Sequence, residues 1–124
     1  MFEFAPCGYI TLNAQQGTIT RCNLSGATLL GIERSHLMGV GMSNFVSRES
    51  EDDYFSAIKR TKESCEQEQK ELKLIRQDNT SLWVRADFKA ISSQGETEPG
   101  QLRIAFMDIT AQKRAEEELQ ESEN

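Results

Sequence analysis

Two short runs of alternating apolar and polar residues begin the pattern of the chain. They cover residues 8–13 (GYITLN) and residues 18–22 (TITRC), and a polar segment ending in Gly17 separates them. Alternation with a period of two is typical of strands with one buried face, and a glycine between two such runs favours a turn. We therefore predict a β-hairpin in which Gly17 takes a positive φ.

Two short helices are predicted after this hairpin. Asn23 is a suitable N-cap for a helix over residues 24–30, which stops at Gly31. A second helix over residues 33–38 stops at a glycine in the same way. Two such helices imply a compact connection rather than a catalytic loop.

A longer amphipathic helix is predicted over residues 50–67. Ser50 and Asp53 fit a capping pattern at its start, and apolar residues then recur at helical spacing. The apolar stripe consists of Tyr54, Ile58, Thr61 and Cys65, with Phe55 beside it.

The period returns to two in three further segments, residues 68–75, 81–91 and 102–108. Five strands with helices gathered between the second and third predict an α+β domain, in which helices cover one face of a single antiparallel sheet. In the long fourth strand, Val84 and Phe88 are expected on the same inner face. The predicted core comprises Leu24, Leu30, Phe45, Phe55, Ile58, Leu74, Val84, Phe88, Ile104 and Phe106.

The last segment, residues 110–124, consists almost entirely of good helix formers. Ile109, Gln112, Glu116 and Leu119 follow the spacing of a coiled-coil seam. We predict a domain over residues 1–109, followed by the start of a coiled-coil or linker helix over residues 110–124. As a short helix of this kind is marginal in water, a frayed, solvated tail is the alternative.

Composition excludes several classes of protein. The 124 residues carry a formal net charge of −6, which argues against binding to nucleic acid or to anionic membranes. The sequence contains no apolar run long enough to span a membrane and no secretory signal. Its three cysteines are far apart, so we expect free thiols rather than disulfides or a zinc site, and a cytoplasmic location.

Several short motifs occur in an order that resembles the PAS domain family, in the form with a C-terminal PAC motif found in bacterial and archaeal sensory proteins. The motifs are FAPCGY at residues 4–9, Asn23, LLG at residues 29–31, LMG at residues 37–39, DNTSLWV at residues 78–84 and DIT at residues 108–110. The resemblance covers nearly the whole chain. It implies strand order 2-1-5-4-3 and a cavity lined by helices.

The resemblance also implies a function. PAS domains of this kind are sensory input modules in multidomain signalling proteins, and the expected effector is the histidine kinase of a two-component system, with a diguanylate cyclase as the second choice. A homodimer is expected. The domain itself is expected not to be an enzyme, since no nucleophile stands beside a base and the sequence contains no nucleotide-binding or metalloprotease motif. A small cavity enzyme is the remote alternative.

Small residues on the predicted inner face leave room for an apolar pocket. It either binds a small molecule or is filled by side chains of the protein. The residues expected to line it are Met38, Met42, Phe45, Phe55, Ile58, Val84, Ala86 and Phe88.

The cofactor is not identified by the sequence. Haem is not expected, because the helix over residues 50–67 has no histidine and the single histidine, His36, lies elsewhere. A flavin that forms a photo-adduct is not expected either, because Cys22 lies in the string RCNL rather than in the cysteine motif of the light-sensing relatives. A flavin without an adduct and a lipid-like or aromatic ligand remain open.

We predict that Asp108, Ile109 and Thr110 relay the signal from the last strand to the C-terminal helix. Either Asp108 or Thr110 can cap that helix. The competing hypothesis is a module that only dimerises or docks. In that case the outward Trp83 and Ile91, with Phe2 and Phe4, form the contact.

Overall fold

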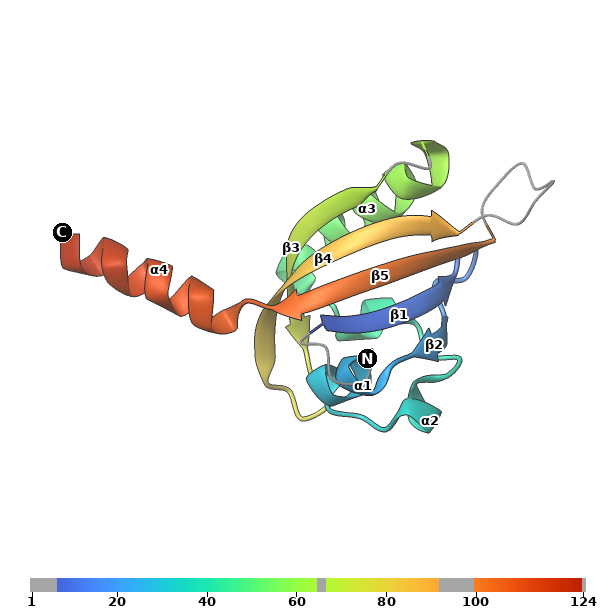
Figure 1. The fold of residues 1–124 in the computed structure, drawn as a ribbon, viewed down its shortest axis with the longest axis horizontal. Coiled ribbons are helices and arrows are strands. Elements are labelled where there is room, and N and C mark those ends of the chain that lie inside the picture. Colours follow the sequence, from blue (N-terminus) through green and yellow to red (C-terminus); the bar gives the residue numbers. More distant parts are fainter. Residues whose placement is uncertain (1–6, 65–66, 92–99, 124) are drawn as a thin grey trace.

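The computed structural model describes residues 7–64, 67–91 and 100–123. Five antiparallel strands form one sheet in the order β2-β1-β5-β4-β3, so the predicted order is confirmed (Figure 1). The strands are β1 (Cys7–Asn13), β2 (Ile19–Cys22), β3 (Glu68–Ile75), β4 (Ser81–Ile91) and β5 (Gln101–Asp108). The helices are α1 (Leu24–Leu30), α2 (Arg34–Leu37), the 3-10 turns η2 (Met42–Phe45) and η3 (Arg48–Ser50), α3 (Glu51–Ser64) and α4 (Thr110–Glu123).

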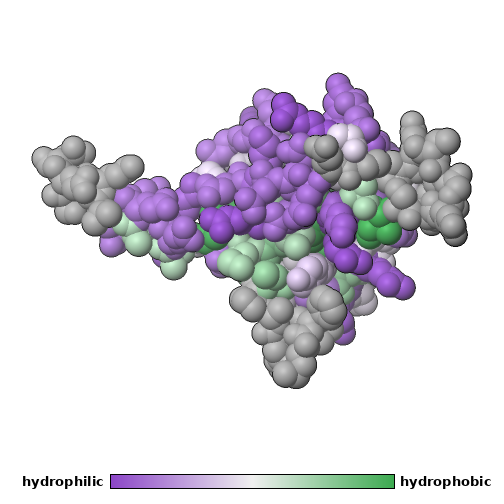
Figure 2. Space-filling model, turned by 45° about the horizontal axis from the view of Figure 1, so that its top comes forward, coloured by the Kyte–Doolittle hydropathy of each residue, from purple (hydrophilic) through white to green (hydrophobic). Residues whose placement is uncertain are grey.

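The core lies between one face of the sheet and the helices α1 and α3. Strand β4 shows the alternation most clearly, because Val84 and Phe88 are buried on the same face while Arg85 and Asp87 point outward. This register, predicted from the sequence, is confirmed. Helix α4 projects away from the sheet (Figure 1). The face in Figure 2 is mostly hydrophilic, with smaller hydrophobic areas.

Left-handed residues form two of the turns. Gly17 has a φ of 71° between β1 and β2, as predicted. Asn79 has the same φ between β3 and β4, a conformation that asparagine tolerates. The Asp78 carboxylate accepts hydrogen bonds from the hydroxyl and the backbone N–H of Thr80, and these bonds lower the pKa of Asp78.

Asn23 joins β1 to the start of α1. Its side-chain oxygen accepts from the backbone N–H groups of Tyr9 (2.9 Å) and Gly26 (2.8 Å). Its side-chain nitrogen donates to the carbonyl of Cys7 (3.3 Å), and its backbone N–H donates to the carbonyl of Tyr9 (3.0 Å). The predicted N-cap is therefore confirmed, and the same amide also holds the neighbouring strand.

Helix α1 approaches β1 closely at a pair of glycines. A Cβ atom added to Gly8 would lie 2.7 Å from the Phe106 ring and 2.8 Å from the Cα of Gly26. These separations are shorter than real Cβ contacts, so the packing requires glycine at position 8.

Two predicted core residues are wrong. Leu24 is 47% exposed at the first position of α1, and Phe55 is 54% exposed. Helix α3 faces the sheet with Tyr54, Ala57 and Thr61. The next residue after Tyr54 lies about 100° further round the helix, so Phe55 points to solvent, and its ring meets that of Tyr54 in a T-shaped contact.

The start and the end of α3 also differ from the prediction. The helix begins at Glu51, and the Ser50 hydroxyl accepts a hydrogen bond from the backbone N–H of Lys73 (2.9 Å) on β3. The helix ends at Ser64, and Cys65 lies outside the described residues. Ile58 is half-buried and packs against the core.

Replacing Asn23 by alanine should destabilise the fold. The variant removes the helix cap and leaves the N–H of Tyr9 without its acceptor, so we expect a loss of about 2–3 kcal/mol in the free energy of unfolding. Urea denaturation followed by circular dichroism measures this. Asn23→Asp keeps the acceptor and should lose less, and Asn44→Ala, at an exposed position, should change stability by less than about 0.5 kcal/mol. Equal effects of Asn23→Ala and Asn44→Ala would contradict the role given to Asn23.

Candidate functional site

The interior space between the sheet and α3 is apolar and closely filled. Among the residues predicted to line a pocket, Met42, Val84, Ala86 and Phe88 meet around this space, and Phe45 is buried in the same core. The full lining is Met42, Tyr54, Leu72, Leu74, Val84, Ala86, Phe88, Ile104 and Phe106. The gap between these side chains is too small to admit a water molecule.

The other three predicted lining residues lie elsewhere. Met38 is 42% exposed at the end of α2, because the preceding Leu37 takes the buried position. Phe55 faces solvent for the reason given above. Ile58 is half-buried and packs against the core. The predictions that Met38 and Phe55 line the interior are therefore wrong.

Tyr54 supplies the polar group of this lining, although it was not predicted to be a site residue. Its side chain is 2% exposed, and its ring lies 6.1 Å from that of Phe88. Burial raises the pKa of the Tyr54 hydroxyl above its usual value, so the group stays neutral at physiological pH. The signal that could have identified it is its position in the stripe of the helix, where an O–H enters an otherwise apolar surface.

The junction between β5 and α4 is held by three hydrogen bonds. Ile109 is buried, and its N–H donates to the carbonyl of Trp83 (2.8 Å) on β4. The N–H of Trp83 donates to the Thr110 hydroxyl (3.0 Å), and the N–H of Thr110 donates to the Asp108 carboxylate (2.9 Å). The three predicted relay residues thus form one connection, which joins the first turn of α4 to the neighbouring strand as well as to β5.

Lys113, one turn into α4, makes further contacts on the outer face of the sheet. Its Nζ lies 2.6 Å from Glu71 Oε1 on β3 and 4.9 Å from the centroid of the Trp83 ring. The hydrogen bond to Glu71 raises the pKa of Lys113, so the amine is charged at neutral pH. Contact with a charged amine over the ring face is a cation–π interaction.

This contact changes the interpretation of Trp83. The competing hypothesis expected its side chain to be an outward interface residue, but the side chain is half-buried and Lys113 lies over it. Ile91 is half-buried too, while Phe2 and Phe4 lie outside the described residues. The contact of Lys113 with Glu71 was not predicted from the sequence, because it depends on where α4 leaves the sheet.

The remaining candidate groups do not gather into a site. His36 is exposed on α2. Cys7 and Cys22 are half-buried, and the thiol of Cys22 donates to the carbonyl of Asn23 (3.2 Å). Within residues 7–64, 67–91 and 100–123, the structure contains no group of three or more His, Cys, Asp or Glu side chains that could hold a metal ion. In the same ranges, the helices are too short or too polar to cross a membrane.

Known structures share this fold. The PAS domain of a protein from Colwellia psychrerythraea is 19% identical, with a TM-score of 0.77 over 89% of this chain and 92% of that chain. The PAS domain of an HTR-like protein from Haloarcula marismortui is 22% identical, with a TM-score of 0.70 over 87% and 85% of the two chains. A sensory box histidine kinase/response regulator from Burkholderia thailandensis is 18% identical, with a TM-score of 0.76 over 96% and 88%.

At the level of sequence, no curated protein matches the chain. The family profile described as PAS domain, however, matches residues 6–111. This range contains the strands, the helices that cover the sheet, and the junction with α4. A sensory rather than a catalytic role follows from the family, and the chain belongs to the PAS domain family.

Proposed function

We propose that this PAS domain is the input module of a larger signalling protein and relays the state of a ligand or partner through α4. The observation that carries the proposal is the set of hydrogen bonds at the junction. Because Ile109 and Thr110 are hydrogen-bonded to Trp83 on β4, a displacement of β4 would move the start of α4 with it.

The expected effector is a histidine kinase transmitter, with a diguanylate cyclase as the second choice. Similar structures from a sensory box histidine kinase/response regulator and from a two-component sensor histidine kinase support this order. In such a protein α4 would pair with its copy in a parallel dimer, and a change in its pitch or register would reach the effector. The size of that effect is limited by the difference in affinity of the input for the two states.

A second candidate is a module that binds no ligand and acts only by dimerising or docking. The tight packing around Ala86 and Phe88 favours it, because the side chains of the protein themselves fill the interior. If the domain instead bound a small molecule in its interior, the side chains there would have to move apart to admit it. The two candidates therefore differ in whether that space can be occupied.

Replacing Thr110 by valine tests the relay. Valine keeps the shape of threonine but cannot accept a hydrogen bond from the N–H of Trp83. We therefore expect the first turn of α4 to be less stable against local unfolding by about 1–2 kcal/mol. Amide hydrogen exchange in that turn should become about tenfold faster, while exchange in the core of the sheet stays the same. In the protein that contains this domain, effector output should no longer follow the input.

Thr28→Val, at an exposed position of α1, provides the matched control. It should leave both helix exchange and regulation unchanged. Normal regulation in a Thr110→Val protein whose α4 exchanges faster would show that the signal leaves the domain by another route.

Replacing Phe88 by alanine tests whether the interior can hold a ligand. The fully buried ring leaves a cavity, so we expect a loss of about 3–5 kcal/mol in the free energy of unfolding. A small apolar probe such as indole should then raise the melting temperature of the variant, because apolar cavities bind apolar molecules. The exposed Phe55→Ala should lose less than about 1 kcal/mol and show no response to indole. Similar losses in the two variants would refute the assignment of Phe88 to the interior.

A further inference from the structure

Three cations lie in one row across four strands of the outer face of the sheet. Thr11 on β1 is paired with Arg21 on β2 and, on its other side, with Arg103 on β5. Arg103 is in turn paired with Lys89 on β4. The three basic side chains are exposed, and the residues next to Thr11 and Arg103 in their strands are buried on the inner face.

This arrangement does not stabilise the fold by itself. Like charges directly opposite each other on neighbouring strands are unfavourable, as in the pair of Lys89 and Arg103. In the part of the chain that the structure describes, no carboxylate forms an ion pair with Arg21, Lys89 or Arg103. Asp87, on the same face of β4, accepts a hydrogen bond from Gln69 (2.8 Å). Among the described residues, this row is therefore a positive cluster on a chain whose net charge is −6.

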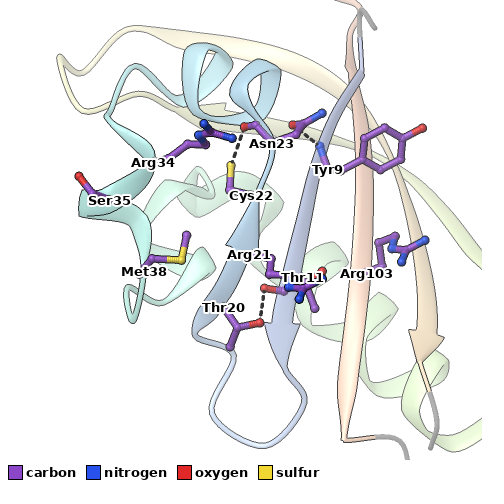
Figure 3. Close-up of a pocket in the computed structure, with 10 residues that line it drawn as sticks. All are labelled: Tyr9, Thr11, Thr20, Arg21, Cys22, Asn23, Arg34, Ser35, Met38 and Arg103. Atoms are coloured by element: carbon purple, nitrogen blue, oxygen red, sulfur yellow. Dashed lines mark hydrogen bonds between the residues drawn. The ribbon is translucent and has the colours of Figure 1, made fainter. Parts of the chain in front are cut away.

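A hollow of about 530 Å³ lies beside this row. Figure 3 shows Thr11, Arg21 and Arg103 on the three strands that line it, with Arg34 and Ser35 of α2 beyond the edge strand β2. The volume is in the range of sites for small molecules, about 300–1,000 Å³. Besides the basic groups, the lining offers the hydroxyl of Ser35 and the exposed thioether of Met38.

We propose that this hollow binds a small organic dianion through Arg21 and Arg103. Guanidinium groups pair with carboxylate and phosphate oxygens in a planar, two-point geometry. Because Arg21 and Arg103 are two strands apart, their backbones are about 9–10 Å apart, twice the usual strand spacing. This spacing suits two anionic groups joined by a short carbon chain better than one inorganic ion. Thr11, which lies between the two arginines, is the residue that such a chain would cross.

The row of Arg21, Thr11 and Arg103 lies on the face of the sheet opposite the closely packed interior. In the proposed sensory function it would be an additional input, but the binding itself does not depend on that function. An extended polyanion fits less well, since the rest of the chain is acidic and would repel it.

Chemical-shift titration of the ¹⁵N-labelled chain at low ionic strength tests the proposal. The probes are succinate, fructose 1,6-bisphosphate, acetate and inorganic phosphate. We expect succinate or the bisphosphate to shift amides around Thr11, Arg21 and Arg103 and to bind at least tenfold more tightly than acetate and inorganic phosphate. The stronger of the two identifies the anionic group as carboxylate or phosphate.

Arg103→Gln should weaken that binding at least tenfold. Arg60→Gln removes the same charge from an exposed position on α3 and should change it less than twofold. Without ligand, Arg103→Gln should melt at the same temperature as the parent chain or higher, because it relieves the repulsion with Lys89. Thr110→Val should keep full binding, so the relay and this site can fail independently.

Three outcomes would overturn the proposal. One is the absence of saturable shifts with either dianion. Another is an equal loss of binding in Arg60→Gln and Arg103→Gln, which would show that binding depends only on the net charge of the protein. The third is binding of a poly-glutamate peptide without binding of the small dianions, which would make this face a docking surface for acidic proteins.

Discussion

The rest of the structure depends on the hydrogen bonds made by the side-chain amide of Asn23. With one oxygen and one nitrogen it satisfies backbone groups of both β1 and α1, and it can do so only because Gly8 and Gly26 let the two elements almost touch. The direction in which the chain leaves β2 is thereby set. Helix α1 then lies against the inner face of the sheet, and α2 comes to the edge beside β2.

The two faces of the sheet have different roles. The inner face, with Val84, Phe88 and Phe106, forms a dry core that gives stability. The outer face carries charged groups at separate places, with Lys113 and Glu71 near the start of α4 and the row of basic residues toward β2. Strands β4 and β5 contribute side chains to both faces. Their backbone therefore links the interior to the junction with α4.

The pattern of the sequence was sufficient for the strands, their buried faces and the cap at Asn23, because each depends on neighbours in the chain. The order of the strands followed from the resemblance to a family. The position of Phe55 was missed, since one residue on a helix changes its direction by about 100°. The contact of Lys113 with Trp83 and the row through Thr11 were beyond the sequence, as they depend on register between strands that are distant in the chain.

The central pairing of β1 with β5 joins the first strand to the last, since Cys7 lies opposite Met107. Contacts so far apart in sequence require closure of a long loop, which slows folding. During synthesis, the hairpins β1–β2 and β3–β4 can each form early, but neither has a partner for its inner edge. Only when β5 leaves the ribosome can it enter between them and close the sheet. A chain cut before Gln101 would therefore have two separate hairpins rather than a smaller version of this domain.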